Sequence, residues 1–411
     1  MISLRSDSVF FKLLTKFIKL IHGTWAIPFV LIMRFIKPLV LIRIGSIRSD
    51  RIGHFVGDAG QQWAMLHNKE DGVIDWYWLQ ENTCNDQWEK MVRRNFPIYF
   101  LVEYLCLWNK YIPGGDAHYR PSTSTRSRDT AGLLEKNSSG MLKFLPEENV
   151  TAKQWLRRQG WADGDPFVCL LVRDSSYLDS RSDLSAYNWD YHSYRNSDLD
   201  SYLLAMEWLA GQGIWVLRMG KNMHKPIKSS NRKIIDYAFS SDRSDLLDIW
   251  LFGNCDLCIS TLSGADYISD VYRRPLLNLN FLPLVDMISW SNSISYPKKL
   301  VWNSSKSNLT LSEYLDNTIY HTEDYVKTGI NIIDLSSSDI LAVVKEAWNE
   351  IKYKDENINN YSDQKNKFWK IVMASNIYMK NHNFIHPNHN FIHPMSRISS
   401  VFLEKNKHFL T

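Results

Sequence analysis

The sequence is poor in cysteine, and this excludes a disulfide framework. The chain of 411 residues holds five cysteines, an odd and sparse count that is typical of a reducing compartment. Cys255 and Cys258 form a C-x-x-C pair, but Cys258 lies in an apolar run that is typical of a buried strand. No second pair of cysteines is present to complete a zinc site. We therefore interpret both thiols as core residues and expect no metal site.

Several familiar motifs are also missing. The sequence has no G-x-G-x-x-G, no P-loop and no G-x-S-x-G. D-x-D triplets at 163–165 and 198–200 fall in a predicted turn and at a predicted helix start, which argues against Mg²⁺-dependent sugar transfer. The net charge of +4 is too small to indicate a nucleic-acid partner. A hydrophobic content of 45% with 22% charged residues is ordinary for a globular chain of two or three domains.

Positive charge is concentrated at the N-terminus. Residues 1–48 contain eight Lys or Arg residues and one acid, and three lysines within 9–21 share one face of a predicted amphipathic helix. The apolar stretch that follows contains Pro28 and ends at Arg34, which makes it too short to span a bilayer. We expect segment 1–36 to lie on the inner face of the cytoplasmic membrane, with residues 9–37 on anionic lipid. The alternative is a basic helix packed on its own N-terminal domain.

Strands and helices alternate along most of the remaining chain. An N-terminal α/β domain at 37–145 opens with an apolar run and a helical pattern. A second domain at 146–354 is cleaner, because its strands are continuously apolar and its loops are short. Its predicted strands are 167–172, 214–219, 256–260 and 276–280, and its predicted helices include 146–160, 197–211, 243–252, 264–272 and 336–351. This pattern predicts a parallel sheet covered by helices on both faces.

The last segment, 355–411, is predicted to be a polar tail. It contains the sequence NHNFIHP twice, at 381–387 and 388–394. The four histidines of the repeat suggest metal binding, but no carboxylate or cysteine accompanies them. We interpret the repeat as a duplication in a disordered segment.

Charged and hydroxyl residues follow the predicted strands of the second domain. Arg173 follows the first strand, Arg218 and Lys221 lie at the end of the next, and Ser263 and Gly264 open a helix after the third. Parallel sheets bind ligands at the carboxyl ends of their strands, and guanidinium groups and helix N-termini favour phosphate. Together these residues predict a phosphate or nucleotide pocket.

In the N-terminal domain the candidate for chemistry is His54. It follows the first predicted strand and lies near the start of the next helix. A histidine in this place can act as a general base near neutral pH. The alternative is a histidine that caps or packs the helix.

These motifs resemble a family of bacterial glycosyltransferases that accompanies surface-polysaccharide synthesis in genomes. The likeness is carried by FVCLLVRDSSYL, IWVLRMGK, IIDYAFSS and CISTLSGADY, and IRIGSIRSDRIGHF resembles the opening motif of the family. It extends roughly over 36–350 and is densest over 167–285. Thr261-Leu-Ser-Gly stands where the family often has Thr-Asn-Ser-Gly.

The resemblance implies two Rossmann-like domains of the GT-B type that face a cleft. The C-terminal domain would bind a nucleotide-sugar donor and the N-terminal domain the acceptor. The family pattern falls on Arg51, Gly53, His54, Arg173, Asp174, Tyr177, Arg218, Gly220, Asp236, Tyr237, Ser263 and Gly264.

The expected function is therefore sugar transfer from a nucleotide sugar to a lipid-linked or cell-surface polysaccharide acceptor, with no cofactor beyond the donor. Arg173, Arg218 and Lys221 would neutralise the diphosphate leaving group. His54, with Arg51 nearby, would deprotonate the acceptor hydroxyl. Two alternatives remain open: a sugar-nucleotide epimerase or hydrolase on the same scaffold, and a non-catalytic partner that binds nucleotide sugar or glycan.

Overall fold

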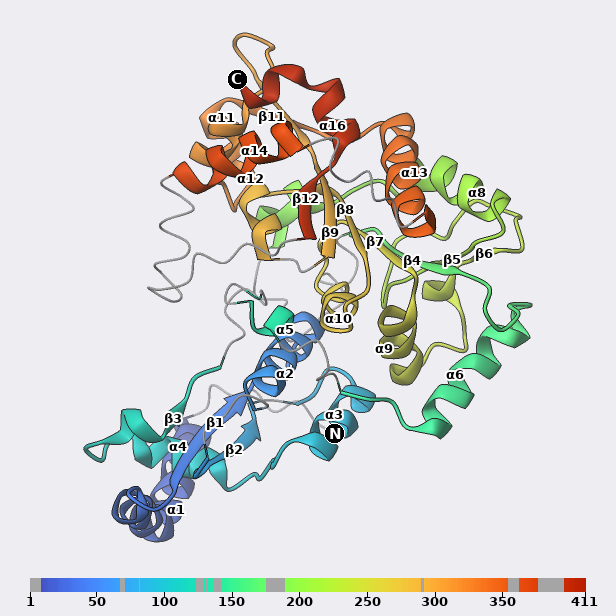
Figure 1. The fold of residues 1–411 in the computed structure, drawn as a ribbon. Helices are drawn as coiled ribbons and strands as arrows, with labels where there is room; N and C mark the ends of the chain where they lie inside the picture. The colour runs from blue at the N-terminus through green and yellow to red at the C-terminus, as the bar shows by residue number, and fades with distance from the viewer. Residues whose placement is uncertain are drawn as a thin grey trace. The chain divides into compact units, whose positions relative to one another are not determined.

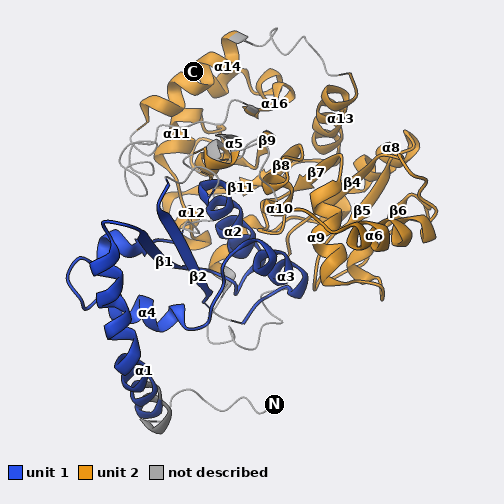
Figure 2. Cartoon of the chain, turned by 60° about the horizontal axis from the view of Figure 1, so that its bottom comes forward, with its two compact units in different colours: residues 1–126 blue, residues 127–411 orange. Residues whose placement is uncertain are grey.

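The chain is organised in two compact units, residues 1–126 and 127–411 (Figure 2). The computed structural model describes residues 9–66, 71–80, 82–122, 129, 132–136, 142–174, 189–289, 292–353, 362–375 and 395–411. Both units are α/β with parallel sheets, which confirms the predicted fold class. The bounds of the four segments derived from the sequence remain predictions.

Unit 1 is a small parallel sheet with helices on both faces. The sheet has the strand order β2-β1-β3, and the cluster of buried residues shared by α1, α4 and β1 covers one face (Figure 2). Its elements are α1 (Val9–Ile36), β1 (Leu41–Ile47), α2 (Ile52–Leu66), β2 (Val73–Leu79), α3 (Asp86–Asn95), α4 (Val102–Asn109), the 3₁₀ turn η1 (Gly115–His118) and β3 (Tyr119–Arg120).

Helix α1 is longer than the sequence pattern predicts. It continues through Pro28, where we expected an interruption, and includes the whole apolar stretch. The turns that follow Pro28 are stabilised by packing, because Val30 and Met33 are buried against Ile44 and Leu105. The stretch Lys16–Ile36 is consequently 21 residues long and apolar enough to cross a membrane by length and composition alone. The prediction that this run is too short is therefore wrong.

Unit 2 is built on a seven-stranded sheet. Helices and strands alternate along its first two thirds, as predicted, and β9 to β12 with α11, α12 and α14 are additions that we did not predict. The elements are α5 (Leu133–Lys136), α6 (Pro146–Arg158), β4 (Phe167–Leu171), η4 (Trp189–Arg195), η5 (Leu199–Tyr202), α8 (Leu203–Gly211), β5 (Trp215–Arg218), β6 (Ile234–Ile235), η6 (Tyr237–Phe239), α9 (Asp245–Asn254), β7 (Leu257–Ser260), α10 (Tyr267–Val271), β8 (Leu276–Phe281), η7 (Leu284–Ser289), β9 (Asn292–Pro297), β10 (Lys299–Trp302), α11 (Leu311–Asp316), α12 (Thr322–Thr328), β11 (Ile330–Ile333), α13 (Ser337–Tyr353), α14 (Ser362–Ala374), β12 (Met395–Ile398), α16 (Ser400–Lys405) and η9 (Lys407–Leu410).

The strand order of this sheet determines where a ligand can bind. The order is β12-β9-β8-β7-β4-β5-β6, and every pair is parallel. Counted along the chain from β4, the strands from β6 to β9 stand in the order 3-2-1-4-5-6 of a doubly wound dinucleotide-binding sheet. The direction of winding reverses between β4 and β7. Helices α8 and α13 cover one face, and α9 and α10 lie on the other (Figure 1).

The strands and helices of unit 2 follow from local sequence. All five residues of β4 are buried, as expected of a central strand with helices on both faces. Helix α9 begins after Ser244, whose side chain accepts a hydrogen bond from the main-chain N–H of Leu247. Helix α6 begins at Pro146, which has no main-chain N–H to satisfy in the first turn.

The described parts of the predicted polar tail belong to the fold of unit 2. Strand β12 pairs with β9 at the edge of the sheet, and Phe368, Phe402, Leu403 and Phe409 are buried. These apolar residues are few among the Lys and Asn residues of the segment. The composition of the segment as a whole therefore indicated a polar tail. The NHNFIHP repeat lies outside the described residues.

We predict that Phe402→Ala lowers the free energy of unfolding by about 3–5 kcal/mol, as expected for a large apolar side chain removed from a core. Phe402 is 2% exposed and packs against Tyr296 and Phe409. Urea denaturation measures the change, with the exposed His408→Ala as the matched control. An equal free energy of unfolding in both variants would show that this end of the chain is a tail.

Candidate functional site

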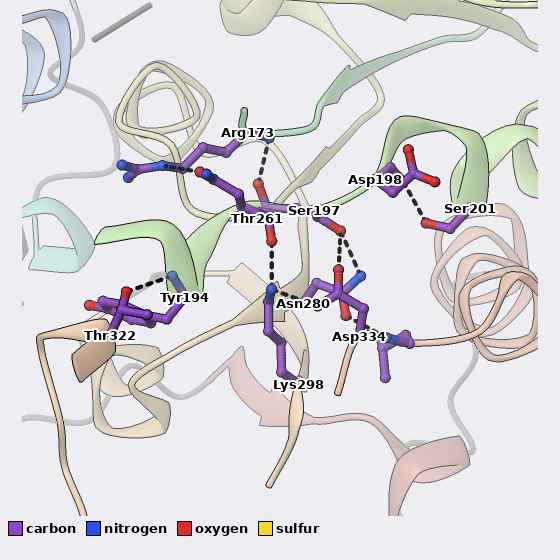
Figure 3. Close-up of polar contacts among 12 residues, drawn as sticks. Arg173, Tyr194, Ser197, Asp198, Ser201, Thr261, Asn280, Lys298, Thr322 and Asp334 are labelled. Atoms are coloured by element: carbon purple, nitrogen blue, oxygen red, sulfur yellow. Dashed lines mark hydrogen bonds and ion pairs between the residues drawn. The ribbon is translucent and has the colours of Figure 1, made fainter. Parts of the chain in front are cut away.

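The carboxyl ends of β4 and β7 meet where the winding of the sheet reverses. Arg173 lies two residues after β4, and its main-chain N–H donates to Thr261 Oγ1 at 2.9 Å (Figure 3). Thr261 directly follows β7. This hydrogen bond joins the two loops that border the crevice in which doubly wound sheets bind ligands.

Two arginines carry positive charge at this place. Burial, followed by the neighbouring charge of Arg195, lowers the pKa of Arg173 to about 9, and the carboxylate of Asp174 opposes this shift. Arg195, at the end of η4, donates to the main-chain oxygen of Leu262 in the loop after β7. Like charges in a buried setting disfavour the charged form, so an anion placed between them would be stabilised. The pair is the strongest electrostatic feature that we find at the strand ends.

Arg195 was missed in the sequence analysis. It lies on a 3₁₀ segment, whereas the candidate phosphate-binding residues are those that follow predicted strands. The segment is held in place by Thr322, whose Oγ1 accepts from the main-chain N–H of Tyr194 at 3.1 Å and donates to the oxygen of Tyr191 (Figure 3). A basic residue in the stretch YRNSDLD, within the resemblance, was the available signal.

The loop at Ser263 and Gly264 does not form the predicted helix end. The N–H groups of Leu262 and Ser263 are used within the loop, by Ser260 Oγ at 3.1 Å and by Asp266 Oδ2 at 2.9 Å. Helix α10 begins only at Tyr267 and has five residues. The predicted helix start at residue 264 is therefore wrong, and the donor-binding role of Ser263 and Gly264 remains a prediction.

Backbone conformation explains part of the motif in this loop. Gly264 has φ 87° and Leu262 has φ 57°, both in the left-handed region. Asn is among the residues that adopt this region most readily after Gly, which accounts for the Asn that the resembled family often has at the position of Leu262. Leu262 is buried, so apolar packing holds the conformation here.

The residues after β5 are held within the fold. Arg218 is 1% exposed and pairs with Asp236 at 3.0 Å, and it also donates to the main-chain oxygen of Lys225. Tyr237 is buried and donates to Asp248 at 2.8 Å, and burial raises its pKa. These contacts account for Arg218, Asp236 and Tyr237 as parts of the core. Their predicted role in donor binding remains a prediction.

The other predicted donor residues lie in the loops after β4 and β5 or outside the described residues. Asp174 accepts from the main-chain N–H of His224 at 3.0 Å, which ties the loop after β4 to the loop after β5. Gly220 has φ 150°, and a Cβ there would lie 2.5 Å from the sulfur of Met223. Lys221 is exposed. Tyr177 lies outside the described residues.

His54 and Arg51 lie in unit 1, at the start of α2, next to a carboxylate. Asp50 accepts from Arg48 at 2.8 Å and lies 3.6 Å from Arg51 Nε. Burial alone would raise the pKa of Asp50, but Arg48, Arg51 and His54 lower it, and the net direction is down. A carboxylate next to a histidine is an arrangement that general-base catalysis uses. Asp50 was not recognised in the sequence. Every predicted donor residue, in contrast, belongs to unit 2.

Cys255 and Cys258 are core residues, as predicted. Cys169, Cys255 and Cys258 are fully buried, and burial raises the pKa of the Cys169 and Cys258 thiols. Within the part of the chain that the structure describes, no group of three or more His, Cys, Asp or Glu side chains could hold a metal ion.

Comparison with known proteins yields similar structures only. No family model and no curated protein matches the sequence. A family 9 glycosyl transferase from Veillonella parvula is similar over 75% of this chain and 97% of its own, with 9% identity and a TM-score of 0.47. ADP-heptose heptosyltransferase II from E. coli is similar over 58% of this chain and 84% of its own, with 10% identity and a TM-score of 0.32.

A third similar structure comes from Listeria monocytogenes and is described as a UDP-N-acetylglucosamine 2-epimerase. It is similar over 58% of this chain and 79% of its own, with 9% identity and a TM-score of 0.27. Because a fold does not determine a function, the choice of reaction depends on the site.

We predict that Arg218→Met lowers the free energy of unfolding by about 3–5 kcal/mol, because it leaves Asp236 without its charged partner. Adding Asp236→Leu should restore much of the loss, since the unpaired carboxylate is then gone. Urea denaturation of both variants measures this. If the folded double variant loses its affinity for nucleoside diphosphates, Arg218 acts on the ligand as the sequence first indicated.

Proposed function

We propose that the protein is a glycosyltransferase that moves a sugar from a nucleotide-sugar donor to a lipid-linked or cell-surface polysaccharide acceptor. The observation that carries this proposal is the pair Arg173 and Arg195 where the winding of the sheet reverses. The diphosphate of a nucleotide sugar is the anion that a doubly wound sheet with two guanidinium groups at this place fits best. The resemblance over 167–285 supports the same reading.

In the proposed reaction His54 accepts the proton of an acceptor hydroxyl. The hydroxyl oxygen then forms a bond to the anomeric carbon of the donor, and the bond from that carbon to the diphosphate oxygen breaks. The electron pair leaves with the nucleoside diphosphate, whose developing charge Arg173 and Arg195 stabilise. Asp50 next to His54 stabilises the protonated imidazole. No metal is needed, because the guanidinium groups neutralise the leaving group.

Product analysis tests the proposal directly. The protein is incubated with nucleotide sugars, with and without a glycolipid acceptor, and the products are separated. Transfer to acceptor that EDTA does not reduce and that His54→Ala lowers by about 10²–10⁴-fold is the expected result. Conversion of donor without acceptor would indicate an epimerase or hydrolase, and binding without turnover a non-catalytic partner.

We also propose that α1 attaches the protein to the inner face of the cytoplasmic membrane. No charged residue occurs between Lys19 and Arg34, and both faces of this part of the helix are apolar. One face is buried in unit 1, whereas on the other Leu31 is 52% exposed and Phe35 is 86% exposed. A helix packed on a water-facing domain ordinarily has a polar outer face, so an apolar one indicates a further apolar partner.

Charge supports an anionic bilayer as that partner. Lys16 and Lys19 are exposed beside Phe17 and Leu20, which are exposed as well, and lysine with apolar side chains is typical of helices at the lipid interface. The helix lies in the plane of the membrane rather than across it. Arg34 donates to Asn109 at 2.5 Å and to the oxygen of Pro113, contacts within unit 1 that a spanning helix would break.

We predict that Arg173→Met and Arg195→Met each lower the affinity for inorganic pyrophosphate about 10- to 100-fold, because each removes a charge-assisted contact worth about 1.5–3 kcal/mol. Wild-type affinity should also fall as the pH rises through about 9, since the charge of Arg173 is present below its pKa and lost above it. Titration calorimetry measures both effects. The exposed Lys228→Met serves as the control, and equal affinity in all variants would contradict the site.

We predict that replacing Leu31, Ile32 and Phe35 by Ser together abolishes flotation with phosphatidylglycerol vesicles, because each side chain contributes about 1.5–3 kcal/mol when buried in an apolar phase. Lys16→Gln with Lys19→Gln should weaken binding only where the vesicles are anionic, by about 1 kcal/mol for each lysine. Val326→Ser, which removes an equally exposed apolar side chain from unit 2, is the control. Unchanged flotation of the triple variant, or none by the wild type, would exclude the anchor.

A further inference from the structure

The end of β9 carries a buried cation that the reaction described above does not use. Lys298 is 3% exposed, and its ammonium group donates to Asp334 at 2.6 Å and to the main-chain oxygen of Asn196 at 2.5 Å (Figure 3). Burial lowers its pKa, and the charge of Asp334 opposes this shift. A buried ion pair adds little net stability compared with apolar residues of the same size, so stability alone does not account for a lysine at this position.

Asn196 connects this lysine to the proposed anion site. Its side-chain oxygen Oδ1 accepts from Nε of Arg173 at 3.3 Å. The next residue, Ser197, donates its main-chain N–H to the oxygen of Arg173 at 3.0 Å. Two neighbouring residues are thus bonded to the side chain and to the main chain of Arg173.

Of these two residues, Ser197 is also bonded to the end of β8. Asn280 is fully buried with φ 51°, and its Nδ2 donates to Ser197 Oγ at 3.0 Å and to the hydroxyl of Tyr202 at 3.1 Å. Ser197 Oγ in turn donates to Asp334 at 3.2 Å. The carboxyl ends of β8 and β9 therefore hold residues 196–197, which hold Arg173.

We propose that Lys298 is a positioning residue for the diphosphate site: it fixes Asn196, and Asn196 orients the guanidinium group of Arg173. This inference rests on the proposed role of Arg173 in binding the donor. Lys298 itself touches no ligand. Its action is to keep Nε of Arg173 occupied by Asn196, so that the outer nitrogens of the guanidinium group meet the phosphate in one orientation.

The test is a double-mutant cycle on the affinity for inorganic pyrophosphate, measured by calorimetry. Lys298→Met and Asn196→Ala should each lower the affinity about tenfold. Asn196→Ala removes Oδ1 but retains the main-chain oxygen that Lys298 holds. If Lys298 acts through Asn196, the double variant loses little more than the weaker-binding single variant.

Lys298→Arg should recover most of the affinity. Lys299→Met, which breaks the neighbouring ion pair with Asp339, should leave it unchanged.

The outcomes separate this inference from the proposed function. If the wild type binds no pyrophosphate, the proposed function fails. If it binds and Arg173→Met weakens binding as predicted, but Lys298→Met retains wild-type affinity or the losses of the Lys298 and Asn196 variants simply add, the positioning role is overturned and the site stands. Should Lys298→Met not fold, Asn196→Ala carries the test, and wild-type affinity in that variant would overturn the proposal.

Discussion

The account depends on two positive charges in partly buried loops at the carboxyl ends of β4 and β7. Burial and the charge of Arg195 both lower the pKa of Arg173, so an anion bound beside these guanidinium groups would be stabilised. Hydrogen bonds from Thr261 and Asn196 hold the main chain and the side chain of Arg173 in place.

The topology of the sheet decides where these charges lie. The chain winds outward from β4 in one direction and from β7 in the other, and doubly wound sheets bind ligands at such a reversal. Arg173 lies in the loop after β4, and Arg195 lies on a 3₁₀ segment that is bonded to the loop after β7. The late strands β8 and β9 extend the sheet and also supply Asn280 and Lys298, which support residues 196–197. Strand β12 forms one edge of the same sheet, although it lies in a segment whose composition is polar.

Sequence reasoning predicted the features that depend on local pattern. Strands such as β4 and β7 were visible because central parallel strands are apolar throughout, and Arg173 was visible because it follows one of them. Strand β9 was not, since its sequence NSISYP alternates serine with apolar residues as in an exposed strand, although most of it is buried. Arg195 could not be found from strand ends. The pairing of Arg218 with Asp236, 18 residues away in the sequence, required the fold to be known. The length of α1 was underestimated because Pro28 was expected to interrupt the helix. Packing against unit 1 stabilises the helix beyond this proline.

The measurement that tests the central claim most directly is the thermal stability of the full chain against a panel of nucleoside diphosphates and nucleotide sugars. A ligand at 100 times its dissociation constant adds about 2.7 kcal/mol to the free energy of unfolding. At roughly 2–4 °C per kcal/mol, a true donor should raise the midpoint by about 5–11 °C. The account predicts such a shift for one base, and in Arg173→Met the same ligand concentration should add only about 0.4–1.4 kcal/mol. No shift with any nucleotide, in protein shown to be folded, would contradict the account and leave the two guanidinium groups as a structural feature.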